Sequence, residues 1–345
     1  MTIARAHLVD PDVTRWYHCV TRCVRRAFLL GEGGSDRKQW IESRLQELTG
    51  LFSIAVGGFA VLDNHLHVLV RLDPQRAGTW SDEEVVRRWG RLFPPRDQMR
   101  LPLEVSQNWV EGRLKDEGWV ATARQRLQSL SWFMKCLKEP LARLVNREEG
   151  ARGAFFEGRY KSVAILDEEA LLATCAYIDL NPVATGIVAA PEAGEHTSIK
   201  QRVEHVEEQG CVETLKAAES GSVAAQAVSS GLEESLWLCP IEDRRGLDST
   251  REGMVEGFTL GNYLLLVEYT GRLFREGKAS ISGELAGVFA RLGSDGESWS
   301  ARLLKLSRGR LLGRYFASSR QRLREVADRL GLHHLANLGG CPART

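Results

Sequence analysis

The sequence has no apolar run close to the roughly 18 to 20 residues that a membrane-spanning helix needs. Its first five residues, Met-Thr-Ile-Ala-Arg, are not followed by the apolar core of a signal peptide. The seven cysteines are odd in number and scattered, and none forms a Cys-x-x-Cys pair. These absences argue against a membrane protein, a disulfide framework and a zinc finger. We expect a cytoplasmic protein with reduced thiols.

A surplus of basic residues is missing as well. Lys and Arg number 46 against 45 Asp and Glu, so the net charge is close to zero. A nucleic-acid-binding surface would therefore need charges of opposite sign to be segregated on the molecule. The 345 residues with 43% hydrophobic content are enough to bury a substantial core. We expect two structural units.

Alternation of apolar and other residues predicts strands over about 14–24, 52–61 and 65–72. Helical spacing of apolar residues predicts helices over about 36–49 and 82–92, and another over 124–149. The pattern therefore mixes strands and helices within the first half of the chain.

The most informative segment is 59–71, Phe-Ala-Val-Leu-Asp-Asn-His-Leu-His-Val-Leu-Val-Arg. On a strand, residues two apart point to the same side, so His65 and His67 face one point in space. Neutral imidazole binds divalent metals, and a third, distant group would complete such a site. The alternative is a pair of ordinary histidines that are exposed or hydrogen-bonded in the core.

A second segment, 167–182, has the pattern of a helix. Asp167 is a suitable N-cap, and Pro182 disfavours helical geometry at the residue before it. Tyr177 and Asn181 are four residues apart and therefore lie side by side. If this helix packs against the histidine strand, Asn181 can supply a third ligand and Tyr177 can face the metal. The alternative is a core tyrosine and a capping asparagine.

The order of these motifs resembles that of the REP-associated tyrosine transposases, relatives of the single-tyrosine HUH transposases. The matching pieces are Asn-His-Leu-His-Val-Leu-Val at 64–70, Phe-Glu-Gly-Arg-Tyr-Lys-Ser at 156–162 and Tyr-Ile-Asp-Leu-Asn-Pro-Val at 177–183. Residues 16–28 are similar to the first strand and basic turn of the larger members. The resemblance covers most of residues 10–190.

The resemblance implies an α+β fold with a ferredoxin-like antiparallel sheet and packed helices. This catalytic domain would occupy residues 1–190, with a helical insertion at about 74–123. Residues 191–345 would form a mainly helical C-terminal region. The long insertion and the C-terminal region have no counterpart to which the resemblance gives a role.

The resemblance further implies that His65 and His67 bind a metal, that Asn181 completes the site and that Tyr177 is the nucleophile. The expected cofactor is Mg²⁺ or Mn²⁺, with Zn²⁺ as an alternative. Attack by the tyrosine on single-stranded or hairpin DNA would leave a 5′-phosphotyrosine and a free 3′-hydroxyl. We therefore expect a transposase-like strand transferase that nicks and rejoins DNA at hairpin-forming repeats.

Two other functions fit the same residues. One is a noncatalytic DNA-binding regulator on this fold, and the other is a metal-dependent phosphodiesterase in which Tyr177 is structural. The target DNA sequence and the oligomeric state stay open.

Basic residues near the motifs fit a DNA partner. Together with neighbouring aromatic residues they can contact phosphates and stack on unpaired bases, although ordinary surface charge explains them equally well. The candidate DNA-binding residues are Arg15, Arg22, Arg25, Arg26, Arg159 and Lys161.

Residues 299–330 are the most basic stretch of the chain. We predict either a DNA-contacting helical appendage or a solvated face that caps the catalytic domain. The basic residues concerned are Arg302, Lys305, Arg308, Arg310, Arg314, Arg320, Arg322 and Arg324.

Overall fold

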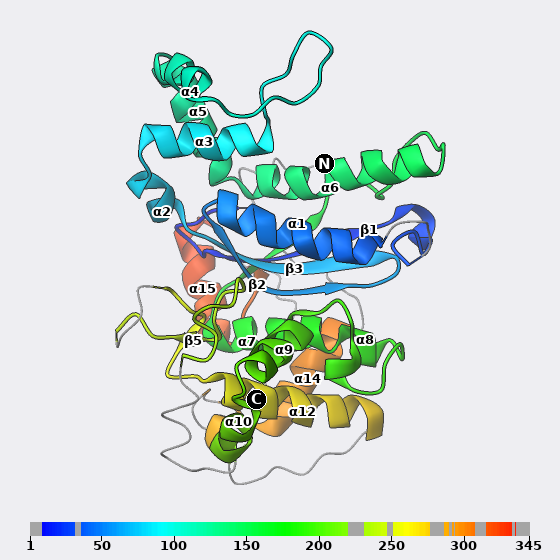
Figure 1. Ribbon diagram of the computed structural model, residues 1–345. Coiled ribbons are helices and arrows are strands. Elements are labelled where there is room, and N and C mark those ends of the chain that lie inside the picture. The colour runs from blue at the N-terminus through cyan, green and yellow to red at the C-terminus, as the bar shows by residue number, and fades with distance from the viewer. Residues whose placement is uncertain are drawn as a thin grey trace.

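A five-stranded sheet forms the centre of the computed structural model (Figure 1). The structure describes residues 9–31, 36–219, 231–246, 251–276, 286–289, 292, 294–307, 315–332 and 335. The strands are β1 (Trp16–Arg22), β2 (Ile54–Val61), β3 (His65–Leu72), β4 (Lys161–Ile165) and the short β7 (Tyr315–Phe316).

The strand order across the sheet is β2-β3-β1-β4-β7. The first three pairings are antiparallel, and only β4 and β7 run parallel. Helix α1 (Arg37–Leu51) connects β1 to β2, and α6 (Leu130–Glu148) is the last of the helices between β3 and β4. Both helices cover the same face of the sheet (Figure 1). The predicted α+β class is confirmed as a mostly antiparallel sheet with packed helices.

The two faces of the sheet follow from the alternation along β3. Leu66, Val68 and Val70 belong to one buried cluster together with apolar residues of α1 and α6. Leu69, between them in sequence, belongs to a second cluster with residues of α7 (Glu168–Asp179) on the opposite face. His65 and His67 share the parity of Leu69, so they point toward the α7 side.

The predicted insertion is helical and has an apolar cluster of its own. Ser81 is the N-cap of its second helix and accepts a hydrogen bond from the backbone N–H of Glu84, so the helix predicted over 82–92 is confirmed. The buried cluster includes Trp80, Trp89 and Val110. The helices are α2 (Pro74–Thr79), α3 (Asp82–Leu92), α4 (Gln107–Leu114) and α5 (Glu117–Leu127).

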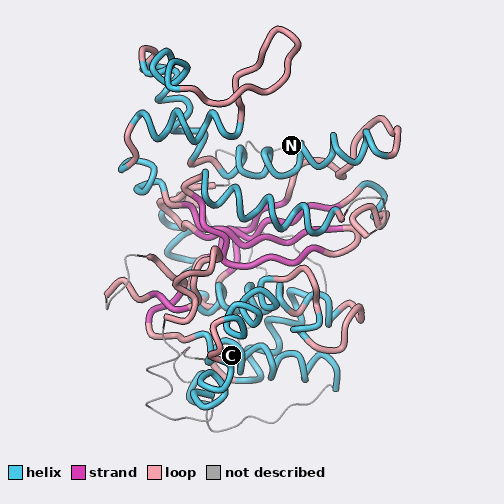
Figure 2. The backbone as a smooth tube through the Cα atoms, in the orientation of Figure 1, coloured by secondary structure: helices cyan, strands magenta, loops and turns pink. Residues whose placement is uncertain are grey.

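A second layer of helices covers the α7 face of the sheet, so that the strands lie between helices on both sides (Figure 2). The buried cluster that contains Tyr177 extends through this layer. It also includes Phe258, Tyr263 and Trp299, which lie far along the chain. The other described elements of this layer are α8 (Asn181–Ala184), η3 (Pro191–Ala193), α9 (Ser198–Glu208), α10 (Val212–Glu219), β5 (Glu242–Asp243), β6 (Val255–Glu256), α12 (Leu260–Glu276) and α14 (Gly296–Ser307). Helix α15 (Arg320–Arg329) instead contributes Leu323 and Val326 to the buried cluster that contains residues of α1 and α6.

The C-terminal region therefore shares its core with the sheet and with α7. The boundary predicted at residue 190 stays a prediction, although apolar packing continues across it. Among the described residues, no helix is both long and apolar enough to cross a membrane.

Candidate metal and nucleophile site

The register of the central strands places several of the predicted residues on one face. His65 lies opposite Arg22 on β1, and His67 lies opposite Val20. Val20 in turn lies opposite Lys161 on β4. Directly opposed residues in an antiparallel pair share a face of the sheet. The two histidines, Arg22 and Lys161 therefore all belong to the face that α7 covers.

Helix α7 brings Tyr177 to this face. Its N-terminus is fixed by Asp167, whose carboxylate accepts a hydrogen bond of 2.8 Å from the backbone N–H of Ala170. A cap of this kind contributes about 1 kcal/mol to helix stability. The helix ends at Asp179. The short helix α8 begins at Asn181, and Pro182 is its second residue. The predicted N-cap is confirmed.

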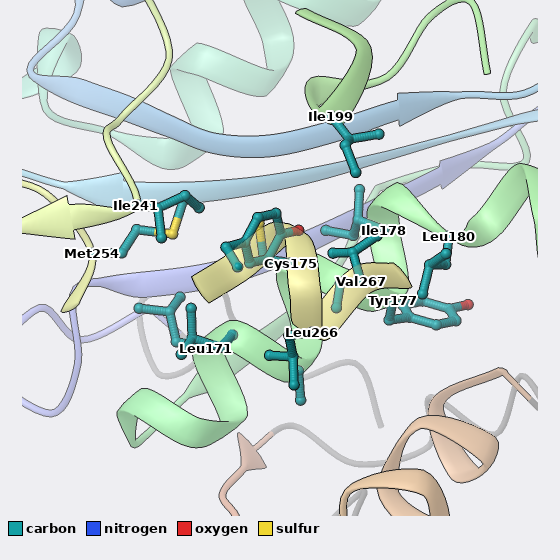
Figure 3. Close-up of a cluster of buried hydrophobic side chains, with 14 of the residues drawn as sticks. Leu171, Cys175, Tyr177, Ile178, Leu180, Ile199, Ile241, Met254, Leu266 and Val267 are labelled. Atoms are coloured by element: carbon teal, nitrogen blue, oxygen red, sulfur yellow. The ribbon is translucent and has the colours of Figure 1, made fainter. Parts of the chain in front are cut away.

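Tyr177 lies at one end of the apolar cluster beneath the sheet. In Figure 3 its ring is on the same side of the view as Leu180, whereas Ile241 and Met254 lie at the other end. The side chain is 5% exposed, and Asn181 is 4% exposed. The ring is thus held by packing on the α7 side and faces the histidines at its rim.

The imidazoles and the phenol converge. The ring centroids of His67 and Tyr177 are 5.6 Å apart with the rings nearly perpendicular. Those of His65 and His67 are 4.9 Å apart. Residues more than one hundred positions apart in sequence are thereby brought into one cluster, as the sequence predicts.

Both histidines are electrically neutral at pH 7. Burial lowers the pKa of His65 to about 4, with the positive charge of Arg22 adding to the decrease. Burial also lowers the pKa of His67 well below its ordinary value, with smaller contributions from neighbouring histidines and Arg22. A metal would therefore find unprotonated ligands and would have no proton to displace.

The hydrogen bond of His65 fixes which of its nitrogens is free. Its Nδ1 lies 2.6 Å from the Oδ1 of Asn64. The amide nitrogen of Asn64 donates to the backbone carbonyl of Arg26, so its oxygen is the atom that faces the imidazole. Because an amide oxygen only accepts, Nδ1 carries the proton and Nε2 carries a lone pair. Metal-binding histidines are commonly oriented in this way.

Two buried polar atoms in the cluster have no hydrogen-bond partner. They are the Nε2 of His67 and the Oδ1 of Asn181. The amide of Asn181 lies close to both His65 and Tyr177. It raises the pKa of His65, which burial lowers more strongly, and it lowers the pKa of Tyr177, which burial raises more strongly. Unpaired buried polar atoms are rare because each costs about 1 to 3 kcal/mol.

These atoms fit a divalent cation. The Nε2 atoms of His65 and His67 and the Oδ1 of Asn181 are the ligand types that Mg²⁺, Mn²⁺ and Zn²⁺ accept. The described part of the chain contains no group of three or more His, Cys, Asp or Glu side chains that could hold a metal. The candidate set is therefore two imidazoles and one amide oxygen, which leaves coordination positions for phosphate and water.

Tyr177 is protonated in this environment. Burial raises the pKa of its hydroxyl group, while the Asn181 amide and the charge of Arg22 act in the opposite direction. The phenol therefore needs added positive charge, or a proton acceptor, before it becomes a competent nucleophile.

The turn after β1 lies at the same end of the sheet as His65. The backbone N–H of Cys23 bonds to the carbonyl of Asn64, next to the histidine. Arg25 and Arg26 follow in the short helix η2 (Val24–Arg26); both are exposed and both have a φ of 55°. Left-handed backbone at two adjacent arginines is uncommon and is concentrated at functional sites.

The remaining candidate basic residues divide into two groups. Arg159 is exposed in the loop before β4, and this loop bonds to the end of β1 through the backbone of Glu157 and Arg22. Lys161 is exposed at the start of β4. Arg15 precedes the other end of β1 and forms ion pairs there, with Asp73 at 3.2 Å and with Glu252. The structure therefore brings every candidate except Arg15 to the histidine end of the sheet.

The sequence analysis did not identify His18, which belongs to the cluster, or Asp179, which lies between Tyr177 and Asn181 in sequence. His18 is 1% exposed and its Nε2 lies 2.8 Å from the Nδ1 of His67. Asp179 is fully buried and accepts hydrogen bonds from the hydroxyls of Ser198 and Tyr263. His18 has the same strand parity as Arg22, and that parity is the signal that could have identified it.

The basic C-terminal stretch is partly neutralised. Arg302 pairs with the nearly buried Glu169, and Arg322 pairs with Glu325 at 3.2 Å. Arg308, Arg310 and Arg314 lie outside the described residues. Whether this stretch contacts DNA stays a prediction.

Comparison with known proteins gives little beyond this geometry. No protein-family model matches the sequence, and no curated protein matches it. One solved structure that is similar is a REP-associated tyrosine transposase bound to a REP hairpin. It is 14% identical, the similarity covers 55% of this chain and 78% of that one, and the TM-score is 0.33.

Proposed function

We propose that this protein is a metal-dependent DNA strand transferase that nicks and rejoins single-stranded DNA at hairpin-forming repeats. The nucleophile is Tyr177, and the intermediate is a 5′-phosphotyrosine. His65, His67 and Asn181 hold Mg²⁺ or Mn²⁺.

One observation carries the proposal. The Nε2 of His67 and the Oδ1 of Asn181 are buried without hydrogen-bond partners, in a cluster where the His67 and Tyr177 rings are 5.6 Å apart. A divalent cation would satisfy both atoms when His67 carries its proton on Nδ1, and a cation beside a phenol suits attack on an anionic ester.

The fold and the motif order are further support. The strand order β2-β3-β1-β4, with α1 and α6 on one face, is the order expected of a ferredoxin-like domain. The matching motifs at 64–70, 156–162 and 177–183 all lie at or beside the cluster.

A bound divalent cation would neutralise charge on a non-bridging phosphate oxygen and favour attack at phosphorus. In the step itself, the oxygen of Tyr177 forms a bond to phosphorus while the bond from phosphorus to the 3′-oxygen breaks. The phenolic proton ends on that 3′-oxygen. The new ester keeps the energy of the broken one, so a 3′-hydroxyl can reverse the step and join strands without ATP.

The chain's own cations would hold and orient the DNA. Arg22 lies across from His65, and its charge already lowers the pKa of Tyr177. Arg25, Arg26, Arg159 and Lys161 are exposed at the same end of the sheet, where they can contact the phosphates on either side of the break.

The burial of Tyr177 favours a rival function. At 5% exposure the ring is held like a core residue, as in a phosphodiesterase with a structural tyrosine. Such an enzyme would cut DNA with water and would form no covalent link.

Incubation with end-labelled single-stranded hairpin DNA and Mn²⁺ tests the proposal. We expect a protein–DNA adduct that survives denaturing electrophoresis and disappears in Tyr177→Phe. The matched control is Tyr269→Phe, which removes the hydroxyl of another buried tyrosine and should keep the adduct. Cleavage without an adduct would support the phosphodiesterase, and binding without cleavage would support a noncatalytic regulator.

A further inference from the structure

His18 is the one histidine of the cluster that the proposed function leaves without a role. It lies on β1, opposite Leu69 of β3 and Val163 of β4, both of which face α7. Its ring centroid is 5.1 Å from that of His67 and 6.1 Å from that of Tyr177. With 1% exposure it cannot contact DNA in this arrangement.

The contact between His18 and His67 is a hydrogen bond that holds one proton. The Nε2 of His18 and the Nδ1 of His67 are 2.8 Å apart. Two imidazole nitrogens at this distance form a hydrogen bond in which one carries the N–H and the other carries the lone pair. One ring must donate and the other must accept.

The direction of this bond decides what the far side of His67 can do. If His67 donates from Nδ1, its Nε2 has a lone pair. If His18 donates instead, the proton of His67 is on Nε2, where it would be a buried donor without a partner. Such a nitrogen cannot bind a metal.

We propose that His18 is a positioning residue that accepts the Nδ1 proton of His67 and so presents the His67 Nε2 lone pair to the cation. Asn64 does the same for His65 over 2.6 Å. The two imidazoles are then oriented alike, each through an acceptor on its Nδ1 side. The inference rests on the proposed function, because it concerns the same metal site.

The nitrogen chemical shifts of His67 in the metal-free wild-type protein test the direction of the bond without any substitution. We expect the signature of a neutral ring protonated at Nδ1. A ring protonated at Nε2 would overturn the proposal.

Mn²⁺ binding in the absence of DNA, measured by titration calorimetry or electron paramagnetic resonance, gives a second test. His18→Phe removes the acceptor, and we expect Mn²⁺ affinity to fall by about 10- to 100-fold. His18→Gln keeps an oxygen acceptor and should recover most of that loss. Cys19→Ala alters the neighbouring buried residue on the opposite face of β1 and should bind Mn²⁺ as the wild type does.

The outcomes separate this inference from the proposed function. Wild-type protein that binds no Mn²⁺ would contradict the metal site itself and the role of His18 with it. Wild-type and His18→Phe proteins that bind Mn²⁺ equally well would remove the role of His18 and leave the site standing. If His18→Phe does not fold, the wild-type nitrogen shifts and His18→Gln decide the matter.

Discussion

The hydroxyl group of Tyr263 on α12 donates a hydrogen bond of 2.5 Å to the carboxylate of Asp179, at the end of the helix that carries Tyr177. The same carboxylate accepts bonds from the hydroxyl of Ser198 and, at 3.0 Å, from the backbone N–H of Ile199. A residue two positions from the candidate nucleophile is therefore anchored by α9 and α12. The C-terminal region contributes directly to the placement of Tyr177.

Tyr263→Phe should destabilise the protein by about 1.5 to 3 kcal/mol, because it removes one donor from a fully buried carboxylate. Burial already raises the pKa of Asp179, and the bonds from Ser198 and Tyr263 oppose that increase. Urea unfolding at pH 7 measures the change. Tyr269→Phe is the matched control on the same helix, since its hydroxyl has no hydrogen bond to any residue that the structure describes.

Loss of this anchor should also slow adduct formation by Tyr177 and weaken Mn²⁺ binding. Asp179 lies two residues from Tyr177 and two residues from the candidate ligand Asn181, so a shift at the end of α7 affects both. Equal stability of Tyr263→Phe and the wild type would show that Asp179 does not depend on this bond.

The buried histidines predict a loss of stability in acid. Burial lowers the pKa of His18 to about 3. Between pH 6.5 and 3, His18 is therefore protonated in the unfolded chain and stays neutral in the folded protein. The contribution to stability is complete above about pH 6.5 and is lost as the pH falls. Each such histidine lowers the unfolding free energy by about 1.4 kcal/mol per pH unit.

Urea unfolding between pH 6.5 and 5 measures this effect. His18→Phe removes one of the titrating groups, so the wild type should lose stability relative to the variant as the pH decreases. Curves of unfolding free energy that stay parallel across this range would contradict the prediction.

Much of the candidate site could be predicted because it depends on local rules. Two-residue periodicity places His65 and His67 on one face, and four-residue spacing places Asn181 beside Tyr177. The motif resemblance predicts that the strand and the helix meet, since no local rule connects a strand to a helix one hundred residues later.

The rest depends on contacts that sequence periodicity does not encode. The partner of His18 is set by the register of β1 against β3, and that of Asp179 by the packing of α12 from 84 residues away. The helix predicted over 124–149 was wrong at its start. The helix is interrupted between α5, which ends at Leu127, and α6, which begins at Leu130. At this point the backbone N–H of Ser53 donates a hydrogen bond to the carbonyl of Leu127.

Arg22 should set the pH dependence of adduct formation. Its charge lowers the pKa of Tyr177 against the larger effect of burial. Arg22→Gln removes that charge, and we expect the midpoint of the pH–rate profile to move to higher pH. Single-turnover adduct formation from pH 6 to 10 measures the shift. Arg22→Lys keeps the charge and should restore the profile; a midpoint that moves equally in both variants would show that the charge is not the cause.

Arg25 and Arg26 should account for part of the salt dependence of single-stranded DNA binding. Each is exposed beside the histidine end of the sheet, and each phosphate contact contributes about 0.7 to the slope of log affinity against log salt. Replacing both with Gln should therefore reduce the slope by about 1.4. Titrations with labelled hairpin DNA at several salt concentrations measure it, under conditions without metal so that no strand is cut.

Arg15→Gln is the control with matched chemistry, because Arg15 precedes the opposite end of β1 and is already paired with Asp73 and Glu252. A slope that falls in Arg15→Gln and stays constant in the double variant would place the DNA at the other end of the sheet, away from Tyr177.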